Sequence, residues 1–394
     1  VCENYGALHW HDEHIKNKPK ATPHFGMCCL QGQIKLPYLR PAPAILQNLL
    51  CGDNPMSKAF LKDIRQYNAA LAFTSLAVKV DEAITNSSGP YCFHVSGELH
   101  HRMGSLLANE GEDLSYAQLY IHDPAEALSM RNRRNPNLKS DIMSQLQDLL
   151  HDVNPYVALY RHAYLIMKDK PQEEYPNIEV RLHVGDGTDG QRYNLPTVDE
   201  LAAIIPGDGS ETVKNDRDIV LRMHDHSLKR ISHLHPSYQS LHYVLLFPYG
   251  ELGWNPNMLL EETERSTRTN RKRLTQHMYY AYRLHDRPAI EPNVPLFRGG
   301  RLTQQYIMDA WASIEQNDLN WVRKNQKTIR ADLYKGVVDA ATNDDGLENS
   351  GQRIVLPSSH TGSPRAMYQL YQDSMAICRA LQKPDIFLTM TANP

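Results

Sequence analysis

The spacing of apolar residues changes along this 394-residue chain, and that change constrains the fold more than any other feature. Runs of β-branched and aromatic residues, which are typical of strands, are concentrated before residue 224. Apolar residues at helical spacing dominate after residue 273. We therefore expect an α+β fold: mixed strands and helices in the N-terminal half, then a mostly helical C-terminal half that ends in one strand.

The same patterns give the expected elements. Helices are predicted over 57–72, 137–151, 155–167, 274–284, 301–323, 329–341 and 364–381. Strands are predicted over 33–37, 74–80, 91–97, 117–123, 178–184, 218–223 and 386–391. The apolar run 241–247 fits a buried strand or a short core helix, because periodicity does not separate the two.

Two breaks in the pattern divide the chain. The Pro-rich stretch 37–43 follows a leader that contains several cysteines and histidines, and the Gly-Asp-Gly-Ser run 207–210 marks an exposed connection. We expect a leader over 1–40, an α+β region over 41–206, and a further domain over 215–394.

Composition narrows the classes of function. The net charge is -3, so any contact with DNA must come from local basic patches. No apolar run approaches the length of a membrane span, and no secretory signal opens the sequence. Because the chain begins with Val1 and ends in an apolar strand that a native protein would cover, we expect a piece of a longer protein.

The leader contains candidate metal ligands. Cys2, the pair Cys28–Cys29, and His9 and His11 offer the soft donors of a tetrahedral structural zinc. The spacing is not a standard CxxC pair, since position 5 is Tyr5. Free thiols on a loosely folded end are the alternative interpretation.

Paired histidines suggest a second kind of metal site. On a strand, His233 and His235 would face the same way and could bind Mg²⁺ or Mn²⁺, which would polarise a phosphate. Because Pro236 follows directly, we favour the alternative that they are loop-edge histidines bonded to backbone or water.

A basic run suggests where DNA would bind. It lies just before three tyrosines, Tyr279, Tyr280 and Tyr282, and such a combination can track phosphates and stack on bases. The candidate DNA-binding residues are Arg265, Arg268, Arg271, Lys272 and Arg273. A solvated helix face with core aromatics behind it is the alternative, and we favour it.

Other catalytic signatures do not occur in the sequence. It has no Walker loop, no GxSxG elbow and no HExxH helix. We therefore assign no catalytic residue in this chain, and we expect it not to hydrolyse ATP by itself.

Several blocks together resemble the helitron helicase-like family. RISHLHPSYQSLHYVLLFPYGELGW at 230–254 resembles the segment that starts this domain, and 299–326 and 351–394 resemble its next two blocks. CENYGALHWHDEH with FGMCCLQGQIKLP is similar to the cysteine-bearing leader of helitron transposases. HVSGELHHRMGSLL, YAQLYIHDPAEALSMR and NPYVALYRHA resemble the region between them.

The resemblance implies a rolling-circle transposon protein whose nuclease and helicase would need Mg²⁺ or Mn²⁺ and ATP. It places the last strand in the first motif of the nuclease, as scaffolding, and places His233–His235 upstream of that motif. Because the family's paired-histidine and tyrosine motifs follow that strand, the resemblance also implies that this chain does not nick DNA by itself. The strand residues are Phe387, Leu388, Thr389, Thr391, Asn393 and Pro394. The family's leader usually has a CxxC, so Tyr5 stands where a ligand is expected, and His9 or His11 would have to replace it.

We therefore expect an N-terminal region of a helitron-type transposase that positions single-stranded or transposon-end DNA, in the nucleus. Neither a membrane nor a small-molecule substrate is an expected partner. The first alternative is a catalytically empty relic that binds an intact transposase or another protein. The second is a small metallo-nuclease that uses His233 and His235.

Overall fold

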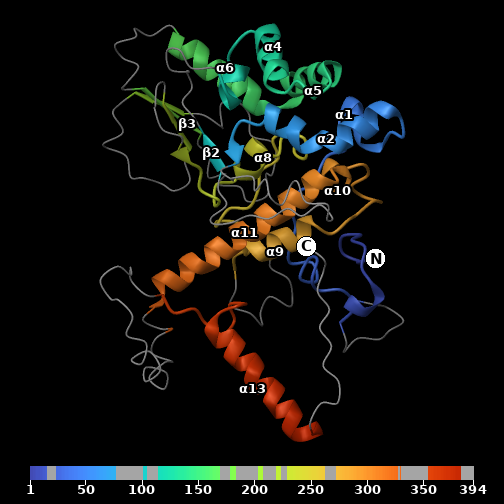
Figure 1. Ribbon diagram of the computed structural model, residues 1–394, viewed down its shortest axis with the longest axis vertical. Coiled ribbons are helices and arrows are strands. Elements are labelled where there is room, and N and C mark those ends of the chain that lie inside the picture. Colours follow the sequence, from blue (N-terminus) through green and yellow to red (C-terminus); the bar gives the residue numbers. More distant parts are fainter. Residues whose placement is uncertain are drawn as a thin grey trace. The chain divides into compact units, whose positions relative to one another are not determined.

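The computed structural model describes residues 1–15, 24–76, 101–103, 114–168, 178–182, 203–206, 219–222, 229–261, 272–326, 329 and 354–382 (Figure 1). The chain divides into two compact units. The first comprises Val1–Lys79 and Val95–Ala310, and the second comprises Val80–His94 and Trp311–Pro394. The boundaries predicted near 40 and 207–214 remain predictions.

Helices are the commonest regular structure among the described residues of the first unit. They are η1 (His11–Glu13), α1 (Ala44–Cys51), α2 (Pro55–Leu71), η2 (Tyr116–Tyr120), α4 (Pro124–Arg134), α5 (Ser140–Val153), α6 (Pro155–Lys168), α8 (Tyr238–His242), α9 (Gln276–Arg283) and α10 (Pro295–Arg298). The helix α11 (Arg301–Lys324) begins in this unit. α4 and α5 pack together, and α5 also contacts α1, α2 and α6 (Figure 1).

The described strands of this unit form two antiparallel three-stranded sheets. In the first, β2 (His101–Met103) lies between β1 (Ser75–Leu76) and β6 (Lys229–Arg230). In the second, β3 (Ile178–Leu182) lies between β4 (Ala203–Pro206) and β5 (Ile219–Arg222). Since β6 follows β2 by more than a hundred residues, the first sheet joins distant parts of the sequence.

The buried faces of α2 and α5 have the spacing that predicted these helices. Phe60, Ile64, Tyr67 and Leu71 are buried along α2, as are Ile142, Leu146 and Leu149 along α5. Polar bonds link the elements: Arg131 of α4 donates to the carbonyl of Ala70, 3.1 Å away, and to Gln147 of α5, 2.5 Å away. Its guanidinium also lies over the ring of Tyr120, 4.6 Å from the ring centroid, which adds a cation–π contact.

The second unit contains the rest of α11 and the helix α13 (Pro364–Leu381). Two hydrogen bonds join the side-chain amide of Gln326 to the backbone of Val355, and the Ser363 hydroxyl caps α13 by accepting from the amide of Ala366. α13 has no buried residue, and Met367, Tyr368, Leu370, Tyr371 and Ile377 are exposed along it. None of the described helices combines the length and apolarity that a membrane span requires.

The α+β, mostly helical prediction is confirmed. The structure contains the helices predicted over 57–72, 137–151, 155–167, 274–284, 301–323 and 364–381, and it places β3 and β5 inside the predicted strands. The predicted strand 74–80 is described only as far as Leu76, at β1. The predicted elements 91–97 and 386–391, and all of 329–341 except Ile329, lie outside the described residues.

Two strand predictions were wrong. Residues 117–123 form η2 and the cap of α4, because the Ser115 backbone and side chain pair with Gln118 in a capping box. Residues 33–37 pair with no described strand, since the amide of Ile34 bonds the carbonyl of Cys29 in a turn. Within the run 241–247, α8 ends at His242, and the residues after it form buried turns.

Candidate metal centres

Three cysteines of the leader lie together in the interior of the first unit. Cys2, Cys28 and Cys29 are each at most 2% exposed, and their sulphur atoms all lie within 4.8 Å of one another. The Cys2 and Cys29 sulphurs are 3.7 Å apart. Zn–S bonds of about 2.3 Å at tetrahedral angles would place two sulphurs about 3.8 Å apart, so this spacing suits a zinc ion.

Tight turns bring these cysteines together. The Cys2 amide bonds the Ala7 carbonyl and the Gly6 amide bonds the Cys2 carbonyl, with Gly6 at a φ of 65°. A Cβ at Gly6 would lie 2.8 Å from Ile290, so a side chain there would also clash. At the second turn, Gly32 adopts a φ of 95° and donates its amide to the Cys29 sulphur, 3.3 Å away.

The environment of the three sulphurs favours one thiolate. Hydrogen bonds from the thiols of Cys28 and Cys29 lower the pKa of Cys2, with help from the backbone amides of Tyr5 and Asn4. The same contacts with Cys2, together with burial, raise the pKa of Cys28 and of Cys29. The cluster can therefore supply a preformed negative charge to a bound cation.

Tyr5 lies beside this cluster and does not complete it as a cysteine would. Its ring packs edge-on against Tyr282 at 5.7 Å between centroids. Burial, followed by the nearby acidic groups, raises the pKa of Tyr5 to about 12, so its phenol stays protonated at neutral pH. Among the described residues the cluster therefore offers three sulphur ligands, and a fourth position is open to another donor.

The predicted histidine ligands do not join the cysteines. His9 belongs to a different group with Glu13 and His285, whose donor atoms also lie within 4.8 Å of one another. The side chain of His11 is 69% exposed, and its ring lies near His14. The structure thus divides the five predicted ligands: the three cysteines lie together, His9 joins a histidine–glutamate group, and His11 belongs to neither.

His233 and His235 belong to neither metal group of the described residues. His235 is buried, and its Nδ1 accepts the Ser237 amide at 3.1 Å in a turn. This arrangement supports the interpretation of a loop-edge histidine.

The basic run is only partly described. Lys272 and Arg273 are exposed, and Arg273 pairs with Leu259 in an isolated β-bridge, whereas Arg265, Arg268 and Arg271 lie outside the described residues. Tyr279, Tyr280 and Tyr282 are at most 7% exposed, so they cannot stack on bases. They are core aromatics, as the favoured alternative predicted.

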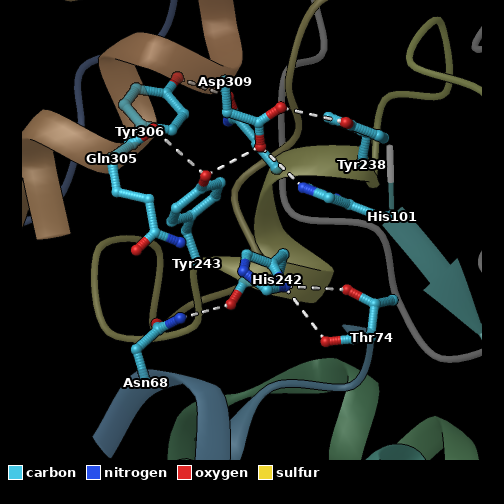
Figure 2. A network of polar contacts seen from close by, with 10 residues as sticks. Asn68, Thr74, His101, Tyr238, His242, Tyr243, Gln305, Tyr306 and Asp309 are labelled. Carbon is cyan, nitrogen blue, oxygen red and sulfur yellow. Dashed lines mark hydrogen bonds and ion pairs between the residues drawn. The ribbon is translucent and has the colours of Figure 1, made fainter. Parts of the chain in front are cut away.

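Sequence patterns contain no sign of the buried network around Asp309 (Figure 2). The carboxylate of Asp309, on α11, lies 2.7 Å from Nε2 of His101 and accepts the hydroxyls of Tyr238 and Tyr243 at 3.1 and 2.8 Å. Complete burial opposes the charge of Asp309, yet the interaction with His101 lowers the pKa of this carboxyl. No short motif joins these residues, because the network forms only when β2, α8 and α11 meet.

Comparison with known proteins finds a family similarity in the C-terminal part of the chain. Residues 279–394 match the family described as the helitron helicase-like domain at the N-terminus. This stretch is helitron-like. The match begins in α9 and confirms the predicted resemblance for 299–326 and 351–394. The match supports the prediction that this stretch is a region of a helitron-type transposase or helicase.

A search of curated proteins finds no match to the chain. The resemblance predicted for the leader and for 230–254 lies outside the matched stretch and remains a prediction. The strand residues 387–394 lie inside the match but outside the described residues.

Proposed function

We propose that this chain is a DNA-positioning and scaffold region of a helitron-type transposase, a rolling-circle replication initiator that works in the nucleus. The observation that carries the proposal is the helitron helicase-like match over 279–394. The exposed Lys272 and Arg273 at the described end of the basic run support it, because cations on a surface can bind phosphates.

A structural zinc at Cys2, Cys28 and Cys29 belongs to this proposal. Buried thiols at tetrahedral spacing, with a backbone amide aimed at one sulphur, support it. A zinc ion there would tie the start of the leader to the Cys28–Cys29 turn, which would fix the leader as a scaffold.

Salt dependence of binding tests the DNA role. The affinity of the chain for a fluorescent single-stranded oligonucleotide should fall steeply with salt, because phosphate contacts release counterions. Replacing Lys272 and Arg273 by alanine should reduce the log–log salt slope by about 0.7 for each phosphate that the variant no longer binds. The matched control replaces Lys58 and Lys62, two exposed lysines of α2, and should leave the slope unchanged.

A flat response to salt, or no binding, would contradict the DNA role. It would favour the second candidate, a module that binds an intact transposase. The apolar residues exposed along α13 and the net charge of -3 favour that candidate.

We also propose that the chain does not nick DNA through His233 and His235. Incubation with a supercoiled plasmid and Mn²⁺ should give no nicked circles. Nicking that disappears in His235→Ala would overturn this statement.

A further inference from the structure

The group His9, Glu13 and His285 lies outside the cysteine cluster and has no part in the proposed DNA role. Its three donor atoms lie within 4.8 Å of one another. It joins the leader, around η1, to the residues that follow α9. A backbone hydrogen bond from the Leu8 amide to the Asp286 carbonyl, 2.9 Å long, joins the same two segments.

The hydrogen bonds of both rings leave a nitrogen lone pair available. The Nδ1 of His285 bonds the carbonyl of Ala281, and a carbonyl only accepts, so the proton is on Nδ1 and the lone pair is on Nε2. The Nδ1 of His9 lies 2.7 Å from the Glu13 carboxylate, which also accepts when ionised. In the neutral imidazole that metal binding requires, the Nε2 of His9 then has a lone pair in the same way.

That second nitrogen of His9 is unsatisfied. The His9 side chain is only 1% exposed, and its Nε2 has no hydrogen-bond partner among the described residues. The ring is held rigidly, since it stacks on Phe25 at 4.2 Å and 7° and lies 4.7 Å from the His285 ring. A buried nitrogen without a partner is destabilising, and a bound cation would supply the missing interaction.

This pattern is the one that proteins use around metal ions. A ligating histidine commonly donates its other N–H to a carboxylate or a backbone carbonyl, which fixes the tautomer and orients the ring. His9 has the carboxylate and His285 has the carbonyl. Neutral imidazole nitrogens suit zinc and related divalent transition metals.

We propose that His9, Glu13 and His285 form a second divalent-metal site, which zinc would occupy. The two imidazoles bind the ion through Nε2, and Glu13 is a positioning residue that holds the proton on His9 Nδ1 and offsets the positive charge. The ion pins the leader to the start of the helitron-like stretch.

Metal stoichiometry of the full chain tests the proposal. The purified protein, dialysed against Zn²⁺, should bind one equivalent more than a His285→Gln variant. The Glu13→Gln variant should weaken binding of that equivalent by about 10–100-fold. His14→Gln is the matched control, because it removes a neighbouring histidine outside the group and should change nothing.

Cobalt distinguishes this site from the cysteine cluster. With Co²⁺, wild type should show thiolate charge-transfer bands plus the weaker bands of a nitrogen–oxygen site, and His285→Gln should lose only the latter. If His285→Gln fails to fold, Glu13→Gln decides, because the Glu13 side chain is 36% exposed and tolerates an isosteric change. Equal stoichiometry and affinity in wild type and in a folded variant would overturn the proposal.

Discussion

At the scale of single residues, the Asp309 carboxylate joins α11 to β2 and to the region of α8 within the first unit. Its two oxygens interact with His101, Tyr238 and Tyr243, which come from β2 and from α8 and the residue after it (Figure 2). The His101 ring also stacks on Tyr238 at 3.9 Å between centroids. Loss of the carboxylate would deprive three buried polar groups of this acceptor.

We expect Asp309→Ala to destabilise the protein by about 3–5 kcal/mol, as for other broken buried charge pairs. Urea unfolding followed by circular dichroism measures the effect. Asp141→Ala, an exposed aspartate in the first turn of α5, is the control and should cost much less. Similar losses in both variants would show that the network contributes little.

His242 gives the fold a dependence on pH. Its buried Nδ1 faces Thr74, and burial, followed by the nearby His101, lowers its pKa to about 3. An unfolded histidine has a pKa of about 6.5, so below that pH the unfolded chain binds the proton first. The stability contributed by neutral His242 is complete above about pH 6.5 and is lost progressively as the pH falls towards 3.

We therefore expect the urea concentration at the unfolding midpoint to decrease as the pH is lowered from about 6.5 to 4.5. The decrease should be smaller in His242→Gln. Asp309, whose pKa is also lowered, loses its contribution only below the unfolded value of about 3.9, so the two effects separate by pH. An unchanged slope in the variant would rule out His242 as the source.

These residue-level features could not have been predicted from the sequence. His101 and Asp309 interact across 208 positions, and neither has a local motif around it. The three leader cysteines were predicted together because they are few and unusual, whereas the partner of His9 was missed, since His285 lies far along the chain.

At the scale of elements, local sequence patterns were sufficient to predict the long helices, but they did not predict the structure of short segments. The helix predicted over 364–381 has those bounds, because Ser363 caps it and Pro364 begins it. The run 117–123 is rich in apolar residues, as strands are, but Ser115 caps η2 and Asp123 caps α4, and these caps decided the outcome. Sheet pairing was unpredictable, since β2 pairs with distant partners.

The cap of α4 allows a test at this scale. Asp123 accepts the amides of Ala125 and Glu126 at 2.9 and 3.2 Å. Asp123→Ala should cost about 1 kcal/mol of stability, and Asp123→Ser should recover most of it, because serine also caps well. Thermal unfolding of the three proteins measures this, and equal losses in Ala and Ser variants would show that the cap is not the cause.

At the scale of the whole molecule, both candidate metal groups among the described residues belong to one of the two units. The cysteine cluster and the histidine–glutamate group both lie in the first unit. Trp10 and Trp254 are in this unit, whereas Trp311 and Trp321 are in the second. Tryptophan fluorescence can therefore follow the units separately when one pair is replaced by phenylalanine.

We expect a zinc chelator to lower the melting temperature reported by Trp254 and to leave that of Trp311 and Trp321 nearly unchanged. Zinc at a free concentration 100 times its Kd would add about 2.7 kcal/mol to the free energy of unfolding. Cys28→Ser should mimic the chelator, and Cys51→Ser, at an exposed cysteine, should not. An unaltered transition after chelation would contradict a structural zinc.

The contacts of Asp309 and of the leader also set the timing of folding during synthesis. His101 meets its partner only after residue 309 has been made, and the leader meets its own only after residues 285–290. At about 5–20 residues per second, His101 is made roughly 10–40 s before its partner, and the leader roughly 15–60 s before its own. During that interval the segments without their later partners are open to chaperones and the three thiols are open to oxidation, so folding in the cell should depend on both.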